Sequence, residues 1–234
     1  MEAAIDAANE RRSVALQKRF EHESKWPLYR ELRLGFTFEG EGPGPTAEPP
    51  IAVRNQGFVS DGPFGRASRF NGETTLVIDE LPIPEAGTWA CWIRVLSDAD
   101  DPMRIIDGNG FMIALQARTL VAGFHDGKSI VLRDRTPLTR GRWTHVALSW
   151  GSSTVSLYVD GARRAVADYS GVPGFPARKV TIGARWTGEQ YHFVGDLDEV
   201  LFYDRPLGED AILSLKEEGL FGGKLPSEIL PNVY

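Results

Sequence analysis

From Leu32 onward the chain is a succession of short β-prone runs separated by turn residues, with no long helical pattern between them. Hairpin-like pairs such as Asp126-Gly127 and Asp160-Gly161 supply the backbone geometry of tight turns. Strands that follow one another without intervening helices pair antiparallel, so the pattern predicts a two-sheet β-sandwich and excludes a parallel α/β sheet. The candidate strands are Leu32–Phe38, Ile51–Gly57, Arg66–Phe70, Thr74–Ile78, Thr88–Leu96, Met103–Ile106, Phe111–Gln116, Thr119–Phe124, Ser129–Arg133, Arg142–Trp150, Thr154–Val159, Ala162–Tyr169, Lys179–Ala184 and Phe193–Tyr203.

The hydrophobic pattern indicates how these strands are covered. Val155, Leu157 and Val159 alternate with polar or exposed positions, as in a strand with one buried face. The run Thr144 to Trp150 is apolar on both faces, so it belongs in a sheet that is covered on both sides. His145 lies within that run, which favours a buried core histidine over a ligand.

The two ends of the chain differ from this central part. Residues 1–25 contain no Gly or Pro, and Leu16 and Phe20 share one helical face, which predicts a helix that ends before Pro27. That helix either packs on its own sandwich or serves self-association or attachment to an upstream domain. We therefore expect a helical extension over residues 1–26, a sandwich over residues 27–220 and an extended tail over residues 221–234.

A second, short helix is expected shortly before that tail. Glu209 and Asp210 place acidic residues in a first turn, Ile212 and Leu215 follow on one face, and Gly219 can end the helix in a left-handed conformation.

Composition excludes several classes of function. The 234 residues carry a net charge of −6, and no cluster of Lys and Arg exceeds three residues, so nucleic acid is not expected as a partner. No apolar run approaches the ~20 residues that cross a bilayer, so no membrane insertion is expected. Cys91 is the single cysteine; it permits no intrachain disulfide and is interpreted as a buried thiol. The N-terminus does not resemble a signal peptide, which leaves the compartment open.

Four groups of motifs in a fixed order resemble the LamG-like jelly roll, the laminin-G type 3 members of the concanavalin A-like lectin/glucanase superfamily. The resemblance covers about residues 32–218 and implies a jelly-roll sandwich. The motifs are Phe36–Gly40, Gly65–Gly72, Arg142–Ala147 leading into Leu157–Gly161, and Gly195–Val200 with Phe202–Leu207. The superfamily contains lectins, adhesion modules, structural domains and glycosidases, so the fold alone does not give the function.

The carboxylates Asp196, Asp198 and Glu199, with Asp204 nearby, are the tightest acidic group. Laminarinase-like members of the superfamily carry Glu-x-Asp-x-x-Glu, which places two glutamates on one sheet face for a retaining hydrolysis. This chain has no such glutamate pair. A catalytic activity is therefore not expected, and a divergent glycoside hydrolase stays the second alternative.

The same resemblance implies a structural calcium ion, because relatives use carboxylates on the first and last strands to hold one. The matching residues are Glu39 and Asp198, with a backbone carbonyl near Gly40 or Gly72. The chain departs from the family pattern at Asn71, which replaces an acidic residue. In the alternative interpretation, Asp198 accepts backbone N–H groups at a β-bulge and binds no metal.

A sugar-binding surface needs exposed aromatic rings beside polar groups, and the segment Ala184 to His192 fits this best. It connects two strands, and loops on a rigid scaffold carry most binding residues. The candidate ligand-binding residues are Arg185, Trp186, Tyr191, Asn109 and His125. The sequence thus predicts a non-catalytic module that binds carbohydrate or a protein partner; the first alternative is a structural or assembly domain that uses residues 1–25.

Overall fold

A computed structural model describes residues 28, 32–39, 51–54, 57–97, 101–108, 110–124, 129–151, 153–169 and 175–220, and of residues 51, 53, 60 and 175–178 it describes the backbone alone. The predicted helix over residues 1–26 and the tail over residues 221–234 lie outside the described residues and stay predictions.

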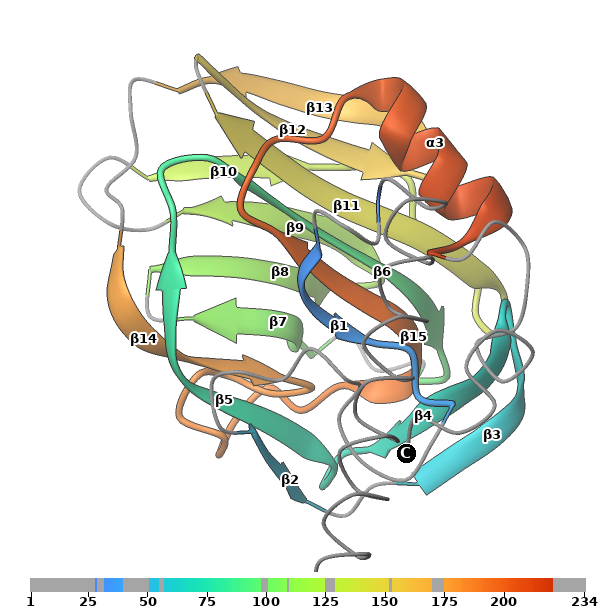
Figure 1. Cartoon of the computed structure of the whole chain (residues 1–234). Coiled ribbons are helices and arrows are strands. Elements are labelled where there is room, and N and C mark those ends of the chain that lie inside the picture. The colour runs from blue at the N-terminus through green and yellow to red at the C-terminus, as the bar shows by residue number, and fades with distance from the viewer. Residues whose placement is uncertain are drawn as a thin grey trace, which may run out of the picture.

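The described chain forms two antiparallel sheets stacked as a sandwich, which confirms the predicted fold class (Figure 1). One sheet has eight strands in the order β13-β12-β11-β6-β15-β4-β3, and β1 also pairs with β15. The other has seven strands in the order β10-β9-β8-β7-β14-β5-β2. The elements are β1 (Leu32–Phe36), β2 (Ile51–Arg54), β3 (Gly57–Gly62), β4 (Gly65–Asn71), β5 (Thr75–Ile83), β6 (Gly87–Val95), β7 (Met103–Gly108), β8 (Phe111–Gln116), β9 (Thr119–Phe124), β10 (Ile130–Arg133), β11 (Trp143–Gly151), β12 (Thr154–Val159), β13 (Ala162–Asp168), β14 (Phe175–Ile182), β15 (Val194–Tyr203) and α3 (Glu209–Glu218).

The main core lies between the two sheets and is rich in aromatic rings. Trp89 of β6 stacks on Phe202 of β15 with ring centroids 4.6 Å apart, and both side chains are fully buried. Trp150 of β11 meets Phe124 of the opposite sheet edge-on at 5.3 Å. Burying rings of this size supplies most of the hydrophobic stabilisation of such a sandwich.

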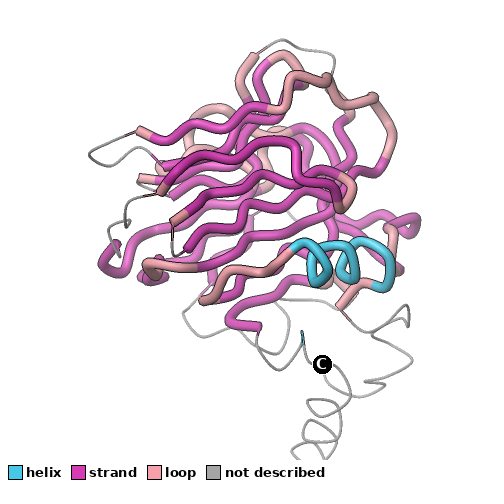
Figure 2. Tube along the Cα trace, turned by 90° about the horizontal axis from the view of Figure 1, so that it is seen from above, coloured by secondary structure: helices cyan, strands magenta, loops and turns pink. Residues whose placement is uncertain are grey.

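Helix α3 covers part of the outer face of the eight-stranded sheet, so that sheet is buried on both sides there (Figure 2). Ile212 and Leu215 of the helix belong to one buried hydrophobic cluster with Ala90 of β6 and Ala147 of β11. This explains why the run Thr144 to Trp150 is apolar on both faces. Gly219 ends the helix at φ 62°, and its N–H donates to the carbonyl of Leu215, as the sequence predicted.

The edge strand β3 was missed by the sequence pattern, which placed a single strand over Ile51–Gly57. The described chain instead forms β2 in the seven-stranded sheet and β3 in the eight-stranded sheet. Strand β3 reads Gly-Phe-Val-Ser-Asp-Gly, and its pairing with β4 is irregular between Val59 and Gly62. A composition so rich in turn-forming residues gives no strand signal.

Two expectations about single residues are confirmed. Cys91 is fully buried, and burial raises the pKa of its thiol. His145 is buried against Trp92, and burial together with Lys216 lowers its pKa to about 3, so it is neutral at physiological pH. No helix among the described residues is long and apolar enough to cross a membrane.

Candidate ligand-binding site

The segment from Gly183 to Phe193, here called the 183–193 loop, connects β14 to β15. Backbone hydrogen bonds within the segment hold its two ends together. The N–H of Phe193 donates to the carbonyl of Gly183 at 2.9 Å, and the N–H of Arg185 donates to that of Gln190 at 2.9 Å. Gly183 has φ 87°, and a methyl group there would collide with the ring of Phe70. The loop therefore presents its side chains from a defined backbone.

Tyr191 is the exposed aromatic residue of this loop. Its side chain is 40% exposed, and its backbone has φ 56°, a conformation that non-glycine residues adopt rarely and that is enriched at binding and active sites. The guanidinium carbons of Arg104 and Arg185 lie 5.2 and 6.0 Å from its ring centroid. The N–H of Arg104 also donates to the Tyr191 carbonyl at 2.8 Å, which joins the loop to β7.

Trp186 lies in the same loop and is partly exposed. Its carbonyl accepts a hydrogen bond from the hydroxyl of Thr181 at 3.2 Å, so the loop folds back over the outer face of β14. Arg185, Trp186 and Tyr191 thus lie on one loop between two strands, and their role in ligand binding stays a prediction.

Asp107 is the buried anion beneath this loop. Its carboxylate forms an ion pair with Nε of Arg104 at 2.7 Å and accepts the N–H of Trp186. Burial raises its pKa to about 6, while the charges of Arg104 and Arg185 oppose that rise. Asp107 therefore links β7 to the 183–193 loop.

The pairing of Arg104 with Asp107 was not foreseen, because residues three apart in a regular strand point to opposite faces. Here the register of β7 against β8 shifts between Arg104 and Ile106, which places both side chains on the outer face. A β-bulge leaves no clear mark in the sequence.

Asn109 and His125, the other two candidate residues, lie outside the described residues. They follow Gly108 and Phe124, which both pair with Phe111 at one end of the seven-stranded sheet. The 183–193 loop begins beside Ile105, whose carbonyl accepts the N–H of Gly183, and reaches Asp107 by folding back. The contribution of Asn109 and His125 to the site stays a prediction.

Glu39, Asp198 and Glu199 are the residues around the proposed calcium position, and they form a carboxylate cluster beside the eight-stranded sheet. Asp198 and Glu199 are buried, and Glu39 is half-buried. Oδ1 of Asp198 accepts the N–H of Glu199 at 2.7 Å, and Oδ2 accepts that of Phe64 at 3.3 Å. Glu39 accepts the N–H of Arg66 at 2.6 Å. Asp198 lies where the pairing of β15 with β6 shifts register, so it does accept backbone N–H groups at a bulge, as the alternative interpretation held.

Burial raises the pKa of all three carboxyl groups in this cluster. That of Glu199 reaches about 8, and both of its oxygens accept the N–H of Leu220, at 3.0 and 3.1 Å. Carboxylate oxygens are the donors that Ca²⁺ prefers. Within the described part of the chain, however, no group of three or more His, Cys, Asp or Glu residues has the arrangement of a metal site.

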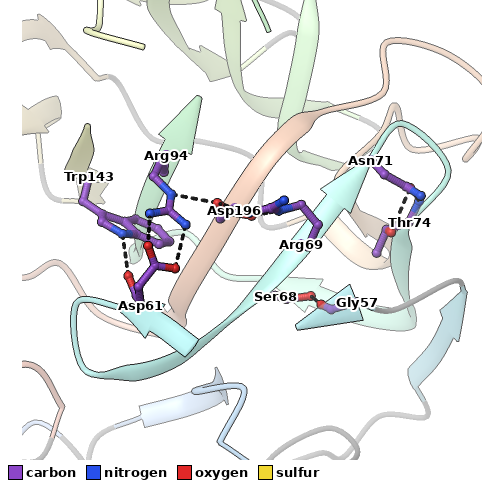
Figure 3. Close-up of polar contacts among 9 residues, drawn as sticks. All are labelled: Gly57, Asp61, Ser68, Arg69, Asn71, Thr74, Arg94, Trp143 and Asp196. Atoms are coloured by element: carbon purple, nitrogen blue, oxygen red, sulfur yellow. Dashed lines mark hydrogen bonds and ion pairs between the residues drawn. The ribbon is translucent and has the colours of Figure 1, made fainter. Parts of the chain in front are cut away.

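Asp196, the remaining member of the acidic group, is the anion of an arginine network (Figure 3). It is fully buried, contacts Nε of Arg69, and accepts a hydrogen bond from Nε of Arg94 at 2.7 Å. Arg94 also binds both oxygens of Asp61 and stacks on Trp143, whose Nε1 donates to the Asp61 carbonyl. The network fastens the edge strand β3 to β6, β11 and β15.

A shallow cavity of about 480 Å³ lies beside this network and is lined by Phe58, Val59, Asp61 and Arg66. The guanidinium of Arg66 sits 4.2 Å from the ring centroid of Phe58. Neither Asp198 nor Glu199 lines this cavity, and both are less than 5% exposed. The acidic group on β15 is thus buried structure rather than an accessible carboxylate pair.

These features define the chain as a two-sheet jelly-roll sandwich with a structured aromatic loop at the surface. The family model of the laminin-G type 3 domains, described as concanavalin A-like lectin/glucanases superfamily, matches residues 70–213. That match covers more than half of the chain, so the chain belongs to this family.

Solved structures of the same fold are distant in sequence. The binding domain of Paraclostridial Mosquitocidal Protein 1 is 17% identical with a TM-score of 0.67, over 81% of this chain and 52% of that one. Domain 4 of AbnA, a GH43 extracellular arabinanase from Geobacillus stearothermophilus, is 17% identical with a TM-score of 0.63, over 80% of this chain and 98% of that domain. The receptor-binding domain of botulinum neurotoxin D is 12% identical with a TM-score of 0.64, over 81% of this chain and 53% of that one. The chain thus spans about half the length of the toxin binding domains. No curated protein sequence matches it.

Proposed function

We propose that the chain is a non-catalytic binding module that recognises carbohydrate through the 183–193 loop. The observation that carries this proposal is the setting of Tyr191. Of the four large hydrophobic side chains exposed in the described part of the chain, it is the only aromatic one, and arginine side chains flank its ring. Aromatic rings beside fixed hydrogen-bonding groups suit a sugar, whose C–H surface is apolar and whose hydroxyls need donors and acceptors.

Two further observations support this function. Domain 4 of AbnA, which shares the fold over nearly its whole length, was solved in complex with arabinotriose. The acidic group on β15 does not favour the alternative of a glycosidase, because Asp196 is bound by two arginines and Asp198 and Glu199 are buried. A retaining or inverting glycosidase needs two carboxyl groups that reach the substrate.

Replacing the loop aromatics tests the proposal. We expect Trp186→Ala and Tyr191→Ala each to weaken binding to the recognised polysaccharide about tenfold, the effect of losing a central aromatic contact. Affinity electrophoresis across a panel of polysaccharides measures this retardation. Val166→Ala is the control, since Val166 is exposed on the edge strand β13 and should leave retardation unchanged. Retardation by no polysaccharide, or equal retardation of all variants, would contradict the proposal.

We also propose that Glu39 and Asp198 hold a structural calcium ion, which would offset the cost of burying their charges. Differential scanning calorimetry tests this as a shift in melting temperature. We expect a higher melting temperature with calcium than with a chelator, and a larger difference at pH 8 than at pH 5, because protons compete with the metal for these carboxylates. Equal melting temperatures in calcium and chelator at pH 8 would show that the cluster holds no calcium.

A further inference from the structure

Positive charge exceeds negative charge around the ring of Tyr191. The guanidinium groups of Arg104 and Arg185 flank its ring. Among the described residues, Asp107 is the one carboxylate in electrostatic contact with these arginines. Glu189 also belongs to the loop, but it is exposed and forms no hydrogen bond or ion pair with either arginine among the described residues. The immediate surroundings of the ring therefore carry an excess of positive charge.

Asp107 forms an ion pair with Arg104 and not with Arg185 among the described residues. Its side chain is 8% exposed and is engaged with Nε of Arg104 and the N–H of Trp186. The head group of Arg185 instead donates to Oε1 of Gln190 at 2.9 Å, which is a neutral acceptor. A guanidinium at a surface loop with only an amide partner keeps donors for an incoming anion.

We propose that the ligand of the 183–193 loop is an acidic sugar, whose carboxylate or sulfate group binds Arg185 beside Tyr191. A planar guanidinium matches such groups through two parallel hydrogen bonds, which are stronger than bonds between neutral partners. Asp107 keeps Arg104 and the Trp186 backbone in place while Arg185 meets the ligand. This inference rests on the proposed carbohydrate-binding function and narrows its ligand class.

The experiment compares matched glycans by isothermal titration calorimetry. The probes are a galacturonate trimer, its carboxyl-reduced neutral counterpart and a sulfated galactan oligosaccharide of similar length. We expect at least one acidic probe to bind about tenfold more tightly than the neutral one, with an affinity that falls as salt is added. Whether the carboxylate or the sulfate probe binds better identifies the source of the anion.

Arg185→Gln should abolish that tenfold preference. The control is Arg133→Gln, because Arg133 is an exposed arginine on β10 that likewise donates to a glutamine, Gln116, at 3.0 Å. It should leave the preference unchanged, and an equal loss in both variants would overturn the inference, because general surface charge would then account for binding. Equal affinity for acidic and neutral probes would overturn the inference and leave the proposed function standing. No binding to any polysaccharide would overturn both.

Discussion

Replacing Asp196 with alanine is expected to lower the free energy of unfolding by about 3 kcal/mol or more. The carboxylate is fully buried and contacts two arginines, and the side chain of Arg94 is itself only 12% exposed. Its removal leaves the Arg94 guanidinium in a poorly hydrated position with one anion in place of two. Breaking a buried ion pair from one side costs more than the pair contributes, since the remaining charge stays buried.

Urea denaturation measures this effect as a lower midpoint at an unchanged slope. Asp61→Ala is the matched control, because Asp61 binds the same arginine but its side chain is 66% exposed. An exposed ion pair contributes little, so the midpoint of this variant should stay close to that of the wild type. Equal destabilisation by both variants would show that burial does not set the importance of the Asp196 contact.

Most of the fold could be predicted from the sequence because the strands of a sandwich carry their own signals. The alternation of Val155, Leu157 and Val159 marks a strand, although the expected exposed face is wrong, because Ser156 and Tyr158 are buried as well. Asp160-Gly161 marks the turn that follows it, with both residues at positive φ. The apolar run at Thr144 to Trp150 even predicted the cover that α3 provides. Strand β3 escaped because pairing with β4, rather than local propensity, makes it a strand.

The candidate site was predictable in part, for a similar reason. Arg185, Trp186 and Tyr191 stand close in sequence, and a strand-connecting loop keeps them together in space. Arg104 and Asp107 come from a distant strand and share a face only through a bulge. Likewise the sequence showed Asp196, Asp198 and Glu199 as one acidic group, but only the tertiary structure separates Asp196, which has arginine partners, from the other two.

The carboxylate cluster of Glu39, Asp198 and Glu199 is expected to make the stability of the metal-free protein fall as the pH rises. Burial raises the pKa of Glu199 from its ordinary value near 4.5 to about 8, so the folded state holds its proton more tightly than the unfolded state. The resulting stabilisation is complete below pH 4.5 and is lost progressively as the pH rises from there through 8, with a size of about 3–5 kcal/mol. Asp198 and Glu39 act in the same direction, because burial raises their pKa as well.

Glu199→Gln should remove most of this loss. A glutamine cannot ionise, and its amide oxygen can still accept the N–H of Leu220 that both carboxylate oxygens now accept. Thermal unfolding in chelator between pH 5 and pH 9 should show a steep fall for the wild type and a shallower one for the variant, which becomes the more stable protein at pH 9. Glu189→Gln, at an exposed loop position, should follow the wild-type curve. Parallel curves for wild type and Glu199→Gln would mean that Glu199 is already ionised at neutral pH. A positive charge from outside the three carboxyl groups of the cluster would then have to balance it.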